Sequence, residues 1–121
     1  TITADNPDKI RQWAVSMRQL ILELENLFAP ISEVRIWATE PNQYIDNNKN
    51  NSPKHKTRFA YIVRNCDNLG QKIIASEMFP VFINGLSDLV HGGNLDVEEV
   101  YIEQYKKQIE CHIETLILLG M

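Results

Sequence analysis

A histidine stands between an apolar segment and a glycine pair, in the run Leu86-Ser87-Asp88-Leu89-Val90-His91-Gly92-Gly93. A histidine side chain can exchange a proton near neutral pH, so His91 is the first candidate for general acid–base chemistry. Glycines directly after a helix let the backbone turn away at positive φ. The sequence therefore predicts a helix that ends at His91. No lysine or arginine lies on that expected helix, so a cationic partner must come from elsewhere in the fold.

Basic side chains gather in one segment of the chain, which contains Lys49, Lys54, His55, Lys56, Arg58 and Arg64. The formal net charge of −4 argues against non-specific nucleic-acid binding over the whole surface. A local basic patch can still hold phosphates, and its candidate nucleic-acid contacts are Lys54, Lys56, Arg58 and Arg64. The alternative is a solvated helix start whose cations pair with neighbouring carboxylates.

Other kinds of site have little support in the sequence. Cys66, Cys111 and the three histidines lack paired ligand spacing such as C-x-x-C or H-E-x-x-H, so no metal site is predicted. There is no glycine-rich phosphate loop, no recognisable nucleophile–histidine–acid order and no carboxylate cluster spaced for two metals. We expect no cofactor. Both cysteines stand in apolar helical surroundings, which predicts buried free thiols and a reducing cytoplasm.

Helical periodicity predicts the elements that position these residues. A first helix opens at Asn6-Pro7, with Asp5 or Asn6 as cap, keeps an apolar stripe from Ile10 to Phe28 and ends at Pro30. A short amphipathic turn over residues 32–37 and an asparagine-rich surface loop over residues 39–53 follow.

The second half of the chain is predicted to hold shorter pieces and one more long helix. A helix begins at Ser52-Pro53 and runs toward Leu69, and a break near Gly70 precedes a short segment at residues 73–74. The next helix is expected to be capped by Ser76, with Pro80 in its first turn. Asp96, with Glu99 three positions on, forms a capping-box pattern for the last helix.

These elements predict an all-α fold, a bundle of four main helices plus short helical turns. With 121 residues and 14.0 kDa, the chain is expected to form one helical domain over residues 1–121. No apolar run reaches the roughly 18 residues of a membrane span, and no signal-type segment is recognised. Because Thr1 opens the chain, we expect a processed end or a C-terminal domain of a longer protein.

The residues around His91 also resemble a known family. The run at residues 86–92 resembles the R-N-x-L-V-H-G signature of HEPN domains, small helical bundles frequent in prokaryotic conflict and RNA-processing systems. Residues 6–12 and 16–20, Ala29-Pro30 and residues 57–62 are similar to helical domains described as predicted PIWI-associating nucleases of prokaryotic defence proteins. The resemblance covers most of the chain. It implies a cytoplasmic homodimer whose partners are RNA or other domains of the same polypeptide.

The resemblance also implies a particular chemistry and shows what this chain lacks for it. Active HEPN ribonucleases use a histidine as acid or base on the ribose hydroxyl and an arginine that stabilises the phosphorane charge, across a dimer interface. His91 takes the histidine position, whereas Leu86 stands in place of the arginine and Ser87 in place of its polar companion. Losing one such donor costs on the order of 100- to 1000-fold in rate. Cleavage is therefore predicted to be weak or absent, with Arg58 as the best replacement for the missing arginine.

Three interpretations of function remain open from the sequence. The first is a HEPN-like dimerisation or scaffold domain of a prokaryotic defence or RNA-related protein, with a degenerate catalytic motif. The second is a metal-independent endoribonuclease that uses His91 with a non-standard arginine. The third is a bundle that binds a small molecule or nucleotide with the basic segment and Trp13 or Trp37. In the simplest alternative for His91, the ring only stabilises the end of its helix.

Overall fold

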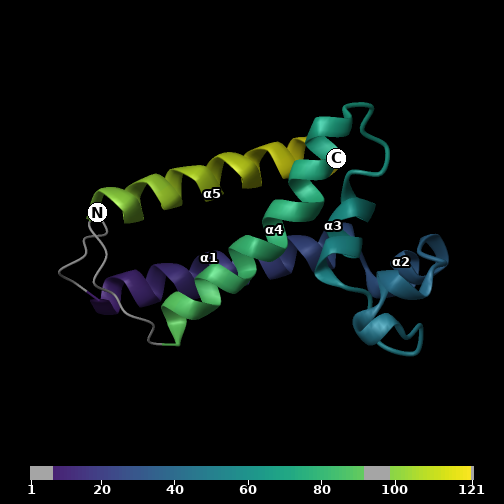
Figure 1. Ribbon diagram of the computed structural model, residues 1–121. Helices are drawn as coiled ribbons and strands as arrows, with labels where there is room; N and C mark the ends of the chain where they lie inside the picture. Colours follow the sequence, from purple (N-terminus) through teal and green to yellow (C-terminus); the bar gives the residue numbers. More distant parts are fainter. Residues whose placement is uncertain (1–6, 92–98, 121) are drawn as a thin grey trace.

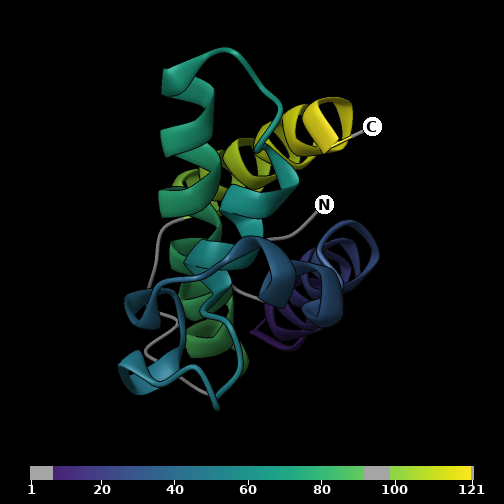
Figure 2. The same ribbon diagram turned by 90° about the vertical axis from the view of Figure 1, so that its right-hand side faces the viewer.

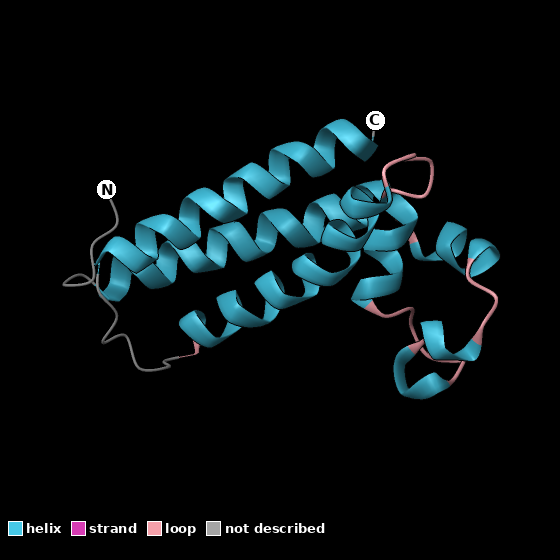
Figure 3. Ribbon diagram, turned by 45° about the horizontal axis from the view of Figure 1, so that its top comes forward, coloured by secondary structure: helices cyan, strands magenta, loops and turns pink. Residues whose placement is uncertain are grey.

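Helices make up nearly all of the chain in the computed structural model, which describes residues 7–91 and 99–120 (Figures 1 and 3). In chain order they are α1 (Pro7–Phe28), α2 (Ile31–Trp37), the 3₁₀ turns η1 (Pro41–Gln43) and η2 (Ile45–Asn47), α3 (His55–Ile62), α4 (Leu69–Val90) and α5 (Glu99–Gly120). The described residues form no strand, only an isolated bridge between Tyr44 and Pro53. The all-α prediction is confirmed, with three long and two short α-helices in place of four main ones.

The first helix matches its sequence pattern closely. α1 ends at Phe28, and Pro30 then takes the N-cap position of α2, because proline has no N–H with which to extend a helix. Part of the predicted apolar stripe faces inward, since Ile10, Ala14 and Ile21 are almost completely buried. Leu20 and Leu27, which the same stripe includes, are 40% and 70% exposed. The expected caps Asp5, Asn6 and Asp96 lie outside the described residues, as do Gly92 and Gly93.

The fourth helix differs from its sequence prediction. The sequence predicts a break near Gly70 and a new helix from Ser76, but α4 is continuous over 22 residues. Asn68 caps it by accepting a hydrogen bond from the Gln71 N–H at 3.1 Å, so Gly70 lies in the first turn and interrupts nothing. Pro80 lies inside the helix, where it removes one backbone hydrogen bond, and α4 bends along its length in Figure 1. Packing against both α1 and α3 compensates for these breaking signals.

Because α4 is continuous, its length and hydropathy also match those of a membrane-spanning helix. By length and composition alone α4 is a candidate for one, and the sequence prediction did not include it because the segment was divided at Gly70. Five of its side chains are buried in this fold: Ala75, Phe79, Phe82, Ile83 and Leu86. These side chains face the core, but only 28% of the most apolar window of α4 is buried. A single helix that passes this test is weak evidence for a span.

A chain of aromatic rings joins the four helices around the core. Phe59 of α3 stacks on Phe79 of α4, with 4.9 Å between ring centroids. Edge-to-face contacts then lead from Phe79 to Phe82 at 5.7 Å, from Phe82 to Tyr105 of α5 at 6.1 Å, and from Tyr105 to Trp13 of α1 at 6.4 Å. In Figure 2, α1 and α5 are seen nearly end-on beside α4. The rings therefore hold α5, α4 and α1 together through direct contacts.

The ring of Tyr105 approaches α4 closely because residue 85 has no side chain. A Cβ atom at Gly85 would lie 2.5 Å from the Tyr105 hydroxyl oxygen, well inside contact distance. Burial raises the pKa of Tyr105 above its usual value, and the negative charge of Asp88 raises it further. The hydroxyl therefore stays neutral where it meets the α4 backbone.

The asparagine-rich segment is a surface loop, as predicted, but hydrogen bonds hold it against α2. Arg35 donates to the carbonyl of Lys49 at 2.7 Å and to that of Asn51 at 2.6 Å. The buried Tyr44 hydroxyl donates to the carbonyl of Ala38 at 2.7 Å. Within η2, Asp46 and Asn47 take positive φ angles of 56° and 54°, a left-handed conformation that aspartate and asparagine adopt more readily than most residues.

The prediction of buried thiols is wrong for one cysteine and only partly right for the other. Cys111 is exposed on α5, and Cys66 is half-buried in the turn between α3 and α4. The apolar neighbours of Cys111 in sequence, such as Ile109 and Ile113, occupy the inner face of α5. Cys111 itself lies on the outer face, because α5 is amphipathic.

We expect Phe79→Ala to lower the free energy of unfolding by about 3–5 kcal/mol, because it removes a ring that contacts Phe59 and Phe82 at the centre of the core. Val81→Ala on the same helix is the matched control, since Val81 is 57% exposed, and its effect should stay within about 0.5 kcal/mol. Urea denaturation followed by circular dichroism measures both. Equal losses in the two variants would contradict the assignment of Phe79 to the core.

Candidate functional site

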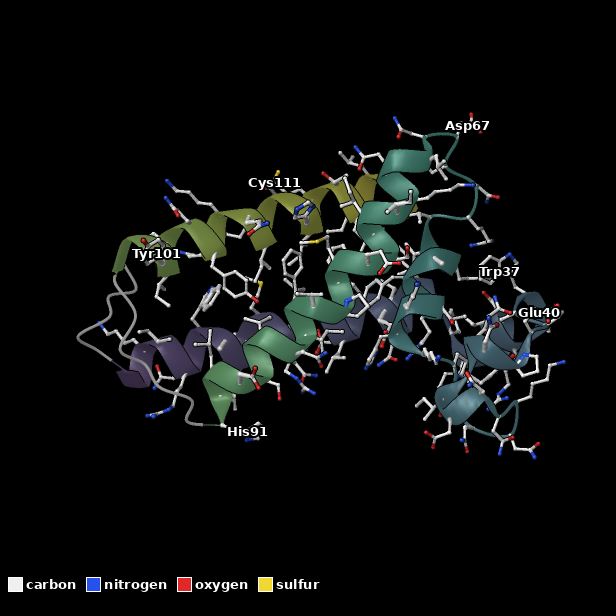
Figure 4. All side chains as sticks on the ribbon, in the orientation of Figure 1. Trp37, Glu40, Asp67, His91, Tyr101 and Cys111 are labelled. Atoms are coloured by element: carbon white, nitrogen blue, oxygen red, sulfur yellow. The ribbon has the colours of Figure 1, made fainter. Side chains whose placement is uncertain are left out.

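The end of α4 carries the residues that the sequence marked for chemistry. His91 is the C-cap residue of α4, and its backbone N–H donates to the carbonyl of Ser87 at 3.0 Å. The prediction that the helix ends at His91 is confirmed, and the side chain is exposed (Figure 4). Leu86 is 0% exposed and belongs to the core. The position at which the HEPN-type signature has an arginine therefore points into the protein.

The candidate replacement, Arg58, is occupied in the interior. Its guanidinium donates to the Glu25 carboxylate at 2.9 Å, to the Asn26 side chain at 2.9 Å and twice to the carbonyl of Ala29. Arg58 is 8% exposed and Glu25 only 1%. His55 contacts the second carboxylate oxygen of Glu25. Arg58 thus closes the C-terminal end of α1 and neutralises a buried carboxylate, which leaves its N–H groups unavailable to a phosphate.

Arg58, on α3, also lies far from His91, at the end of α4. Arg58 is adjacent in sequence to Phe59, whose ring stacks on Phe79. His91 comes twelve residues after Phe79, which at about 1.5 Å per residue is about 18 Å along the helix. The structure therefore does not bring the two candidate catalytic residues together within one chain, and their catalytic role stays a prediction without geometric support.

The other three predicted nucleic-acid contacts do meet on one concave surface, which we call the α3–α4 groove. One hollow of about 250 Å³ is lined by Trp37, Ala60, Arg64, Lys72, Ile73 and Ser76. A second, of about 360 Å³, shares Ala60 and Ser76 and adds Lys54, Lys56 and Thr57 with two side chains of η1. The groove therefore contains three of the predicted cations, Lys54, Lys56 and Arg64, and one that was not predicted, Lys72. The fourth predicted cation, Arg58, faces the interior.

Aromatic stacking fixes one wall of this groove. The guanidinium of Arg64 lies over the ring of Tyr61 at 3.8 Å, and its Nη1 donates to the Tyr61 carbonyl at 2.9 Å. Trp37 meets the same tyrosine edge-on, with centroids 5.6 Å apart. Burial raises the pKa of Tyr61, the hydrogen bond from its hydroxyl to Glu33 raises it further, and the Arg64 charge partly opposes the shift. Tyr61 is therefore a neutral support between a cation and an indole.

Sequence reasoning missed Lys72 because it began the helix too late. With the cap placed at Asn68, Lys72 and Ser76 follow four residues apart and share a face of α4. The signal was Asn68, an N-cap type of residue, with apolar residues four apart at Leu69 and Ile73 after it.

Trp13, the other tryptophan proposed for ligand binding, packs instead against Tyr105, and its Nε1 is buried without a hydrogen-bond partner.

Among residues 7–91 and 99–120, no group of three or more histidine, cysteine, aspartate or glutamate side chains is placed to hold a metal ion. Comparison of the chain with protein-family models, curated proteins and solved structures found no match. The likeness to HEPN domains thus rests on the short sequence runs named above.

We expect Arg58→Ala to lower the free energy of unfolding by about 3–5 kcal/mol, because it leaves the Glu25 carboxylate buried without its cation. The matched control is Arg64→Ala, which removes an exposed arginine from just beyond the same helix and should cost about 1 kcal/mol or less. Urea denaturation at pH 7 measures both variants. An Arg58→Ala protein as stable as the control would mean that the guanidinium is exposed in solution.

Proposed function

We propose that this chain is a HEPN-like association domain that does not cut RNA. The observation that carries the proposal is the burial of both cation positions that the sequence offers to His91. Leu86 is fully buried in the core. The Arg58 guanidinium is hydrogen-bonded to the Glu25 carboxylate and to the carbonyl of Ala29 at the end of α1. A second copy of the chain would bring the same two buried positions, so neither position supplies a guanidinium across a dimer interface.

An apolar hollow near the C-terminal end of α4 supports the association part of the proposal. It has a volume of about 360 Å³ and is lined by Gly85, Leu89, Tyr101, Ile102 and Tyr105, from α4 and α5. Tyr101 at its edge is 59% exposed, which is a large aromatic surface to leave in water. The HEPN resemblance implies a dimer interface at the helix that carries the histidine, and α4 is that helix. We therefore place a second copy of this chain on the hollow.

We expect the protein to sediment as a dimer at micromolar concentration. Tyr101→Glu should weaken self-association at least about tenfold, because it places a charge at the edge of the hollow. Leu118→Glu is the control, since Leu118 is 74% exposed on the same helix but does not line the hollow. Sedimentation velocity over a concentration series measures both. A wild-type monomer at high micromolar concentration, or equal effects of the two variants, would contradict the proposed interface.

We expect no cleavage of single-stranded RNA above background in EDTA, and no difference between the wild type and His91→Ala. The physical reason is that position 86 carries a buried leucine and the Arg58 guanidinium is bound to Glu25, so neither position offers His91 a cation. A labelled RNA incubated with equal amounts of each protein gives the measurement. Metal-independent cleavage that disappears in His91→Ala would instead establish the endoribonuclease interpretation.

A further inference from the structure

The α3–α4 groove contains four cationic side chains, of which only Lys56 forms an ion pair with a carboxylate among the described residues. Lys54 and Lys56 line one part of it, and Arg64 and Lys72 line the other. Lys56 pairs with Glu77 at 2.8 Å, on a surface where both side chains are more than half exposed. Within the described ranges, no carboxylate forms an ion pair with Lys54, Arg64 or Lys72. In a chain with a net charge of −4, this concentration of unpaired cations marks the groove as a site for an anion.

The shape of the groove separates it from an ordinary patch of surface lysines. Ala60 of α3 and Ser76 of α4 line both hollows, so the two hollows adjoin at small side chains where α3 and α4 pack. The cations line the hollows from α3, from α4 and from the segments on both sides of α3. With volumes of about 250 and 360 Å³, the two parts together fall in the range of small-molecule sites.

An aromatic ring and an aliphatic side chain lie at the same end as Arg64 and Lys72. Trp37 is 41% exposed and Ile73 is 52% exposed, and both line the smaller hollow. Trp37 is held in place by its edge-on contact with Tyr61, which is itself packed under Arg64. A fixed and partly exposed indole beside cations can stack on a planar base without losing side-chain freedom.

We propose that the α3–α4 groove binds a nucleoside phosphate, with the base against Trp37 and Ile73 and the phosphate oxygens held by Arg64 and the surrounding lysines. The phosphate displaces Glu77 from Lys56 when it reaches that part of the groove. The ligand is a free nucleotide or a nucleotide within a single strand, since both present the same base and phosphate. The site lies near the opposite end of α4 from His91 and does not depend on the association domain proposed above.

The test is isothermal titration calorimetry at low salt with four probes: AMP, adenosine, inorganic phosphate and a short oligoadenylate. AMP should bind at least about tenfold more tightly than either adenosine or phosphate, because only AMP engages both the indole and the cations. Binding of AMP identifies a free nucleotide as sufficient, whereas binding of the oligoadenylate alone identifies a strand as the source. No binding of either, or phosphate binding as tight as AMP binding, overturns the proposal.

Variants connect any binding to the groove. Trp37→Ala and Lys72→Ala should each weaken AMP or oligoadenylate binding about fivefold or more. Lys107→Ala, which removes an exposed lysine from α5, is the charge-matched control and should leave affinity unchanged. Circular dichroism checks that each variant is folded. Equal affinities for all three variants and the wild type would place the binding elsewhere, and the proposal would fail even if the dimer is confirmed.

Discussion

The arrangement of the helices depends on the ion pair between Glu25 and Arg58, two charges buried where α3 meets the end of α1. Burying such a pair costs solvation, and the cost is offset only when the remaining hydrogen-bonding groups are satisfied. Here Asn26, Ala29 and His55 provide the additional partners. The pair anchors α3 to the end of α1, and α3 in turn packs on α4 and carries Phe59 to the aromatic core. A buried electrostatic contact between residues far apart in sequence thus joins α1 to α3 beside the aromatic core.

The same contact explains why the side chains of the basic segment are divided between the interior and the groove. Arg58 faces inward toward α1, while Lys54, Lys56 and Arg64 line the groove on the side of α4. The residues are close in sequence and alike in charge, but the short α3 helix sends their side chains in different directions. α4 is organised in a comparable way, with the groove beside its first half and the histidine at its far end. The cations of the groove and His91 are therefore kept apart by the length of α4.

The sequence predicts most of the helices and part of the groove, for physical reasons that can be named. α1 was predictable because its apolar period is long and Pro30 ends it. α4 was divided wrongly because Gly70, Ser76 and Pro80 are local breaking signals, and tertiary packing overrides them. Charge alone predicts Lys54, Lys56 and Arg64 as one candidate patch, and all three line the groove. The fate of Arg58 was not predictable, because its partner Glu25 is distant in sequence and looks like a surface residue of an amphipathic helix.

The contact between Gly85 and Tyr105 has a consequence for the sequences that this fold accepts. No side chain fits at position 85 while the tyrosine hydroxyl occupies its place beside the α4 backbone. A phenylalanine at 105 removes that hydroxyl and makes room for alanine at 85. Among homologous chains the two positions should therefore covary. Paired substitutions at positions 85 and 105 would then show, from the sequences alone, that α5 packs on α4 at this point.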